Sequence, residues 1–385
     1  MSTPDSLHKV LVYRSALLPY SETFVKQQIQ ACERWDPLLV GQRHLDELDL
    51  SGLDIVMEPS GQSGLFNRAL RKLMRTPAPL LKFYRQLHGK LVHVHFGTDA
   101  AARWPLFEQL ETPVIVTLHG YDICTYRDWW EAGNRGDFMA TYPERLIEMT
   151  DSSQVRCVAV SEAIRQRAIE FGISPERIEV AYIGIDTAQF IPGEIPITKR
   201  RKRIAFVGRL VEKKGAAILL EAFKTVQRHV SNAELVIIGD GPLRDELQAY
   251  TRKHDLAVTF AGVMTAEEIR AHLHESRVLC LPSVTAANGD AEGFGLVLLE
   301  AQACGVPVVT SAHGGATEGI EHGKTGFAFP ERDVATLAQY LEVLLTDDVL
   351  LDEMSHAAPT FVRENFDLRR CTRSLEAIYD RACAR

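Results

Sequence analysis

The sequence predicts an α/β protein with two Rossmann-like domains, and three observations support this. Short apolar runs of strand length alternate with longer amphipathic stretches, which is typical of parallel sheets covered by helices. The alternation is interrupted by residues 191–203, a segment rich in proline, glycine and basic residues that we interpret as a linker, and then resumes. A length of 385 residues suits two or three domains. The default ligand site in such a protein is a cleft between the domains.

The candidate strands of the first half end near small or polar residues, where α/β sheets place their ligand-binding loops. Helical patterns at 216–229 and 243–254 separate strands of the second half. The candidate strands are residues 10–13, 91–96, 114–118 and 155–160 before the linker, and 204–207, 234–238, 259–261, 278–281 and 306–309 after it.

Composition and charge exclude several classes of function. The hydrophobic content of 46% is ordinary for a soluble globular chain, and the net charge of −8 argues against a general affinity for nucleic acid. The seven cysteines include no C-x-x-C pair, so neither a zinc ribbon nor a redox dithiol is predicted, and their odd number predicts a reducing compartment. The N-terminus lacks a signal-peptide core, and no apolar stretch approaches about 18 residues. We therefore expect a cytoplasmic protein.

The segment from Glu292 to Glu300 is the most informative motif. Its two carboxylates are eight positions apart, and if the run from Gly295 is helical they lie roughly 12 Å apart along the axis. That distance exceeds the roughly 5–9.5 Å needed for a carboxylate pair that acts on one glycosidic bond. It is also too long for the two to share one metal ion. The spacing suits a ligand with two separated polar groups, such as a nucleoside diphosphate sugar, and the glycines allow backbone N–H groups to approach it.

A loop that carries Arg209 and Lys214 follows a predicted strand and precedes a predicted helix. A guanidinium and an ammonium at this place can bind a diphosphate, although a solvated basic turn would have the same pattern. The turn at residues 239–242 also follows a strand, but Arg244 stands where a dinucleotide fingerprint has its third glycine. An NAD-dependent oxidoreductase is therefore disfavoured, and we interpret this turn as structural.

Together these motifs resemble the retaining glycosyltransferases of family 4. The resemblance covers residues 204–330 and is closest to the subgroup of exopolysaccharide and colanic acid biosynthesis. It implies a GT-B fold with an acceptor domain at 1–190, a donor domain at 204–359 and a last helix at 360–385 that returns to the first domain. It also implies catalysis without a metal or cofactor. The motifs are Gly208-Arg-Leu-Val-Glu-Lys-Lys-Gly215, Ile237-Ile-Gly-Asp-Gly-Pro-Leu243, Leu281-Pro-Ser283, Glu292-Gly-Phe-Gly295 with Glu300, and His313-Gly-Gly315, with looser matches at Ser21-Glu-Thr-Phe-Val25, His93-Val-His-Phe-Gly97, Leu118-His-Gly-Tyr-Asp122 and Ala159-Val-Ser-Glu162.

The resemblance also implies roles on the donor side. Arg209 and Lys214 would hold the donor diphosphate and stabilise the charge that grows on the leaving group. Glu292 would contact hydroxyls of the donor sugar, and Glu300 would accept hydrogen bonds from the ribose. An exposed helix carboxylate is the alternative for Glu300. The other expected donor-binding residues are Gly208, Gly293, Phe294, Gly295, Leu296, Val263, Met264 and Ser161.

On the acceptor side, His119 follows a strand and precedes a glycine. The family places a histidine there beside the donor sugar, and the alternative is a hydrogen-bonded core imidazole. Asp122 is expected to orient this histidine or to contact the acceptor. Many relatives have a glycine pair in the first strand–helix loop, which this chain lacks. We therefore expect side-chain contacts from Ser21, Glu22 and Thr23.

The window from Pro59 to Thr98 contains no Asp or Glu although the chain is acidic overall. Apolar residues at helical spacing accompany its cations, so residues 65–90 are a candidate for docking on an anionic membrane. A solvated basic face is the alternative. We expect a nucleotide sugar donor (UDP-hexose first, GDP-mannose second), an acceptor saccharide that is lipid-linked, and no nucleic acid. A catalytically idle GT-B binding protein, or transfer to a soluble small molecule, remains open. The cations of the window from Pro59 to Thr98 are Arg68, Arg71, Lys72, Arg75, Lys82, Arg85 and Lys90.

Overall fold

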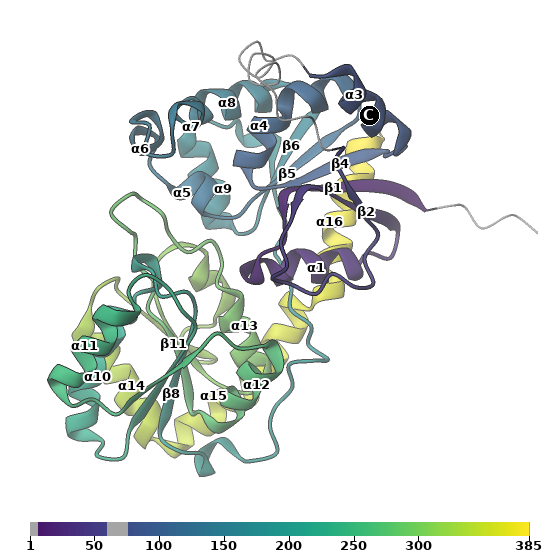
Figure 1. Cartoon of the computed structure of the whole chain (residues 1–385). Helices are drawn as coiled ribbons and strands as arrows, with labels where there is room; N and C mark the ends of the chain where they lie inside the picture. Colours follow the sequence, from purple (N-terminus) through teal and green to yellow (C-terminus); the bar gives the residue numbers. More distant parts are fainter. Residues whose placement is uncertain (1–6, 60–75, 385) are drawn as a thin grey trace, which may run out of the picture. The chain divides into compact units, whose positions relative to one another are not determined.

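The computed structural model describes residues 7–59 and 76–384, and contacts divide the chain into two compact units (Figure 1). The first unit consists of Met1–Gly184 together with Leu368–Arg385, and the second of Ile185–Asp367. The segment at 191–203 belongs to the second unit by this division. Within it, the buried Arg200 side chain donates hydrogen bonds to the carbonyl groups of Ile195, Leu273 and Ser276.

The first unit is built on a parallel sheet of seven strands in the order β3-β2-β1-β4-β5-β6-β7. Its central strands are buried on both faces, which explains their continuous apolar runs. The four predicted strands are present, while β2, β3 and β7 were not predicted. The strands are β1 His8–Leu17, β2 Trp35–His44, β3 Ile55–Met57, β4 Leu91–His95, β5 Val114–Leu118, β6 Val155–Ala159 and β7 Ile178–Val180.

Helices cover both faces of this sheet. The last helix, α16 Leu368–Cys383, contributes Leu375, Ile378 and Tyr379 to the same hydrophobic core as Val10 and Trp35 (Figure 1). The α-helices before it are α1 Thr23–Gln30, α3 Ala78–Gln86, α4 Gly97–Phe107, α5 Tyr121–Cys124, α6 Arg127–Glu131, α7 Asp137–Ala140, α8 Tyr142–Asp151 and α9 Glu162–Phe171, with short 3-10 turns that include η1 Tyr20–Glu22.

A buried carboxylate attaches α16 to the sheet. Glu376 is fully buried, and its Oε1 atom accepts hydrogen bonds from three consecutive backbone N–H groups, those of Glu33, Arg34 and Trp35, at 3.0, 2.7 and 3.0 Å. These groups lie at the turn between α1 and β2. Since buried donors without a partner are costly, this one side chain stabilises both the turn and the position of the helix.

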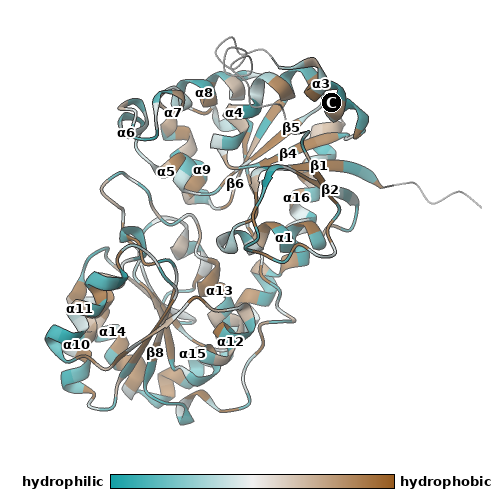
Figure 2. Ribbon diagram, in the orientation of Figure 1, coloured by the Kyte–Doolittle hydropathy of each residue, from teal (hydrophilic) through white to brown (hydrophobic). Residues whose placement is uncertain are grey.

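The second unit is built on a parallel sheet of six strands in the order β10-β9-β8-β11-β12-β13. Figure 2 shows that hydrophobic residues gather along the strands. The strands are β8 Arg203–Val207, β9 Glu234–Ile238, β10 Val258–Gly262, β11 Val278–Leu281, β12 Val308–Ser311 and β13 Gly326–Phe329. The helices are α10 Ala216–His229, α11 Arg244–His254, α12 Ala266–Glu275, α13 Leu296–Ala303, α14 Val334–Thr346 and α15 Asp348–Phe366, and the 3-10 turns include η5 Glu212–Lys214 and η6 Gly314–Gly319.

The two parallel sheets confirm the predicted α/β fold with two Rossmann-like domains. In each sheet the strand order reverses once, between β1 and β4 in the first and between β8 and β11 in the second. Ligands of such sheets bind outside the carboxyl ends of the strands at these points. In the described part of the chain, no helix is long and apolar enough to span a membrane.

Candidate active site

The loop after β8 reaches the loop after β11 in the second unit. Gly215 has a φ of +70°, and a Cβ atom there would lie 1.8 Å from the carbonyl oxygen of Pro282, just after β11. Only glycine permits this approach. The close contact brings the turn η5, which carries Lys213 and Lys214, beside the segment that leads to Glu292.

Two consecutive lysines form ion pairs with two carboxylates of that segment. Lys214 Nζ lies 2.5 Å from Glu292 Oε2, and Lys213 Nζ lies 2.9 Å from Asp290 Oδ1. The Ser283 hydroxyl also donates to Glu292, at 3.3 Å. Burial raises the pKa of Glu292, but the two ammonium groups lower it by more, so the net pKa is below its usual value. Glu292 is therefore ionised and paired at neutral pH.

Glu300, the second carboxylate of the motif, has the opposite environment. It lies on α13, which begins at Leu296 directly after Gly295, and its neighbours Leu298 and Leu299 are buried. Within residues 7–59 and 76–384, no hydrogen-bond or ion-pair partner of its carboxylate is found. Burial raises its pKa from 4.5 to about 7. A partly buried carboxyl group with a strongly raised pKa and no partner is a candidate for ligand binding.

The other residues expected on the donor side differ in their exposure. Arg209 and Val263 are exposed, Met264 and Gly208 are partly exposed, and Gly293 and Phe294 are buried at the start of the motif. A Cβ atom at Gly239 would lie 2.1 Å from the carbonyl oxygen of Gly208, so this turn packs against the β8 loop. This contact agrees with its structural interpretation. Ser161 lies in the first unit, where its hydroxyl accepts the Ile164 N–H at 3.1 Å and caps α9.

In the first unit, His119 follows β5 and contacts a second histidine. Its Nε2 atom lies 3.0 Å from His95 Nδ1, and the two rings stack with centroids 5.2 Å apart. Burial lowers the pKa of His119 well below its usual value, and the positive charge of Arg14 lowers it further. The imidazole is therefore neutral at physiological pH.

Asp122 binds backbone groups rather than the imidazole of His119. Its Oδ1 atom accepts the N–H groups of His119 and Gly120, both at 3.0 Å, and Oδ2 accepts the Gly97 N–H at 2.8 Å. The side chain is fully buried, and burial raises its pKa although these hydrogen bonds lower it. Asp122 thus fixes the loop that carries His119.

Glu22, expected as a contact to the acceptor, forms a buried bidentate ion pair with Arg14. Arg14 Nε and Nη2 donate to the two carboxylate oxygens at 2.9 and 2.7 Å. Arg14 also pairs with Asp99, which accepts hydrogen bonds from the backbone N–H and the hydroxyl of Ser15 at 2.8 and 2.9 Å. The neighbouring residues Ser21 and Thr23 are exposed.

Several of these residues were missed by sequence reasoning. Asp290 does not stand out in a segment of small and polar residues, and Ser283 was noticed only as part of the motif Leu281-Pro-Ser283, without a role. His95 was noticed only as part of a motif, without a role. Arg14 carries no sequence signal, because a cation at the end of a strand is most often exposed.

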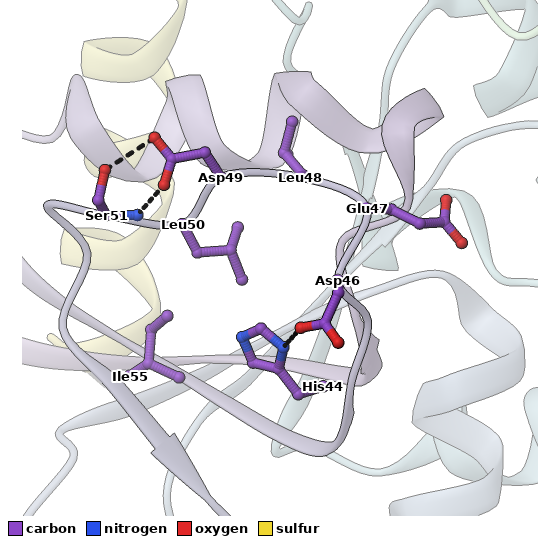
Figure 3. Close-up of a pocket in the computed structure, with 8 residues that line it drawn as sticks. All are labelled: His44, Asp46, Glu47, Leu48, Asp49, Leu50, Ser51 and Ile55. Carbon is purple, nitrogen blue, oxygen red and sulfur yellow. Dashed lines mark hydrogen bonds and ion pairs between the residues drawn. The ribbon is translucent and has the colours of Figure 1, made fainter.

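A pocket of about 450 Å³ lies at the carboxyl end of β2, apart from these groups (Figure 3). The His44 Nδ1 and Asp46 Oδ1 atoms lie 3.3 Å apart, and Asp49 accepts hydrogen bonds from Ser51. None of the expected site residues lines it. No group of three or more metal-ligating side chains is found among the described residues. Its lining residues are His44, Asp46, Glu47, Leu48, Asp49, Leu50, Ser51 and Ile55.

Two Rossmann-like domains, with a lysine–glutamate pair and a second glutamate eight residues on, define the class of GT-B glycosyltransferases. The family model described as Glycosyl transferases group 1 matches residues 188–361, and the model described as Glycosyltransferase Family 4 matches residues 31–189. The chain belongs to glycosyltransferase family 4, a retaining family.

Named relatives agree with this membership. The chain is 31% identical over 292 residues to the amylovoran biosynthesis glycosyltransferase AmsK of Erwinia amylovora, covering 75% of this chain and 69% of that protein. It is 34% identical over 258 residues to the putative colanic acid biosynthesis glycosyltransferase WcaL of Escherichia coli K12, covering 64% and 59%. The crystal structure of Anabaena HepE in complex with UDP and glucose has a TM-score of 0.78 and 20% identity over 97% of this chain and 99% of that chain, which shows the same fold.

Proposed function

We propose that this glycosyltransferase moves a hexose from UDP-hexose to a saccharide acceptor in the biosynthesis of a bacterial surface polysaccharide. The observation that carries the proposal is the ion pair of Lys214 and Glu292 beside the loops after β8 and β11, with Glu300 on the helix α13 that follows. Together these residues offer a cation for a diphosphate, an ionised carboxylate for sugar hydroxyls and a second carboxylate for ribose.

In the proposed mechanism, the Lys214 ammonium binds the donor diphosphate together with the exposed Arg209 guanidinium. Lys214 exchanges part of its contact with Glu292 for phosphate oxygens, and Glu292 becomes available to hydroxyls of the donor sugar. When the bond from the anomeric carbon to the phosphate oxygen breaks, negative charge grows on the diphosphate. Cations that are already positioned stabilise this charge more in the transition state than in the ground state, which lowers the barrier.

The choice of UDP over GDP rests on HepE, whose crystal structure contains UDP and glucose. A thermal-shift panel of UDP-, GDP- and ADP-sugars tests it. A donor at 100 times its Kd should stabilise the protein by about 2.7 kcal/mol. The Lys214→Ala variant is the matched control, because it should lose the shift for every nucleotide sugar. A shift with GDP-mannose alone would contradict the choice of donor and leave the class of reaction intact.

A lipid-linked acceptor at the cytoplasmic face of the inner membrane is the second part of the proposal. AmsK and WcaL are named for the biosynthesis of amylovoran and of colanic acid, and the acid-free window supplies basic residues for anionic lipid. Within α3, Lys82 and Arg85 are exposed. The other cations of the window that carry the argument, Arg68, Arg71, Lys72 and Arg75, lie outside the described residues.

Vesicle co-sedimentation tests the membrane contact. Binding should rise with the fraction of anionic lipid and fall with added salt, because the Debye length is about 10 Å at 0.1 M. Replacing Arg71, Lys72 and Arg75 by Glu should abolish sedimentation and leave the thermal shift with the donor unchanged. If the wild-type protein ignores anionic vesicles at low salt, a soluble saccharide or small molecule becomes the favoured acceptor.

A further inference from the structure

We infer that His95 is a positioning residue, which holds the imidazole of His119 in one tautomer and one orientation and leaves Nδ1 as the His119 ring nitrogen available to a ligand. The inference rests on the proposed function and on the role that the resemblance to family 4 implies for His119. It assigns a role to the second histidine of the segment from His93 to Gly97.

The contact between the two imidazoles joins one specific nitrogen of each ring. His119 Nε2 and His95 Nδ1 are 3.0 Å apart, and the ring planes differ by 27°. His95 is almost completely buried at the end of β4. When both rings are neutral, one of these nitrogens donates and the other accepts, so the proton position on His95 fixes the tautomer of His119.

Three groups around the pair keep both rings neutral. The Arg14 guanidinium donates to the His95 carbonyl oxygen at 3.4 Å, and its charge opposes a second cation. Glu22 and Asp99, the nearby carboxylates, are both paired with Arg14 and are not free to stabilise an imidazolium. Burial is the largest cause of the lowered pKa of His95. The stable state is therefore two neutral rings joined by one N–H···N hydrogen bond.

Aromatic side chains hold the His119 ring on its other sides. The Phe24 ring lies 5.0 Å and the Phe96 ring 4.4 Å from the His119 ring, centroid to centroid. Phe96 has a φ of +73°, a left-handed conformation that is rare for a bulky residue. Such backbone strain clusters at functional sites, where surrounding contacts maintain it. Here the strained residue packs its ring against His119. The guanidinium of Arg14 lies 4.4 Å from the centroid of the same Phe96 ring.

The other buried histidine of β4 has separate partners. His93 Nε2 lies 2.7 Å from the Thr117 hydroxyl, and His93 Nδ1 lies 2.6 Å from the Tyr379 hydroxyl on α16. Its ring lies tilted against that of His95, with the centroids 4.3 Å apart, and makes no hydrogen bond to His119. The hydrogen bond between Tyr379 and His93 therefore provides a matched control on the neighbouring ring.

The test combines steady-state kinetics with ¹⁵N chemical shifts of the histidine rings in the full-length protein. His95→Phe keeps an aromatic ring and removes the hydrogen bond, and His95→Asn can restore it, because an amide reaches the position of Nδ1. We expect His95→Phe to lower kcat by about 10²-fold with little change in the donor KM, since misplacement of a catalytic group costs about this much. The His119 ring shifts should change from one neutral tautomer to a mixture, and His95→Asn should recover most of both properties.

Tyr379→Phe should lower stability but leave kcat and the His119 shifts unchanged. The inference is overturned if His95→Phe retains the wild-type kcat, or if it loses activity while the His119 ring shifts stay as in the wild type. His119→Ala separates this inference from the proposed function. If His119→Ala is fully active, the role proposed for His119 fails, whereas an inactive His119→Ala beside an active His95→Phe refutes the role of His95 alone.

Discussion

Replacing Glu300 by Gln should make the protein more stable at alkaline pH and weaken donor binding at the same time. Burial raises the pKa of this carboxyl group from 4.5 to about 7. The difference corresponds to about 3 kcal/mol between the charged and neutral forms, since one pKa unit is about 1.4 kcal/mol. Gln keeps the shape of the side chain and never pays this cost.

The sign of the pH dependence follows from proton counts. Between the two pKa values the folded chain keeps a proton on Glu300 that the unfolded chain has lost, so the free energy of unfolding falls as pH rises. The contribution is complete below pH 4.5 and is lost as pH passes about 7. From about pH 5.5 to about pH 8.5, the wild type should lose about 2 kcal/mol relative to Glu300→Gln. Urea unfolding of both proteins at the two pH values measures this difference.

The affinity for the donor should rise with pH, whereas the stability falls, because both depend on the ionisation of Glu300. Ribose hydroxyls donate to a carboxylate, so the charged form of Glu300 binds, and only about a tenth of the molecules carry it one pH unit below the pKa. Affinity of the wild type for a UDP-sugar should therefore fall about tenfold from pH 8 to pH 6, while Glu300→Gln should bind weakly at both. If the free energies of unfolding of the two proteins changed equally between the two pH values, the raised pKa would be refuted. A stability difference without a pH-dependent donor affinity would refute the ribose contact.

Three further variants test other contacts. Lys214→Ala should lower turnover by about 10²-fold, as for loss of one positioned charge, and near-normal turnover at saturating donor would contradict its role. Glu292→Gln removes the partner of Lys214, so free UDP should bind more tightly by calorimetry while turnover falls; weaker UDP binding would argue against competition between the ion pair and the diphosphate. Glu376→Ala should lower the free energy of unfolding in urea by about 3 kcal/mol, because three backbone N–H groups, of which that of Trp35 is buried, lose their acceptor. A loss under about 1 kcal/mol would show that another group replaces it.

The fold could be predicted because its signals are local. The central strands are buried on both faces and read as apolar runs, and helical patterns separate them. The strand β2, Trp35–His44, escaped prediction because Pro37 and Gly41 interrupt its apolar pattern. It forms a strand because it pairs in parallel with nearly the whole of β1, and such pairing is a tertiary effect that overrides propensity.

The candidate site could be predicted where one short segment carries the chemistry. The motif from Glu292 to Glu300 was singled out by its spacing, and the loop of Lys214 by its place between a predicted strand and a predicted helix; their roles came from the resemblance to family 4. What could not be read is how the carboxylates are paired, because the partners are far apart in the chain. Lys214 and Glu292 are 78 positions apart, and the Arg14 and Asp99 pair spans 85 positions. No local pattern predicts that Glu292 is paired while Glu300 has no partner in the part of the chain that the structure describes.

Each unit carries a cation at or after its first strand, and the two cations differ in how many N–H groups they have free for a ligand. Arg14 lies within β1, three residues before its end, and Lys214 follows β8, the first strand of the second unit. The Arg14 guanidinium donates to Glu22 twice, to Asp99 and to a carbonyl oxygen, so its donors are largely used. In the part of the chain that the structure describes, the Lys214 ammonium hydrogen-bonds to Glu292 alone, and an ammonium has three N–H groups. Lys214 can therefore bind a diphosphate at small cost in free energy, whereas Arg14 would first have to break buried hydrogen bonds. This difference in unused N–H groups favours the second unit as the one that binds the nucleotide sugar.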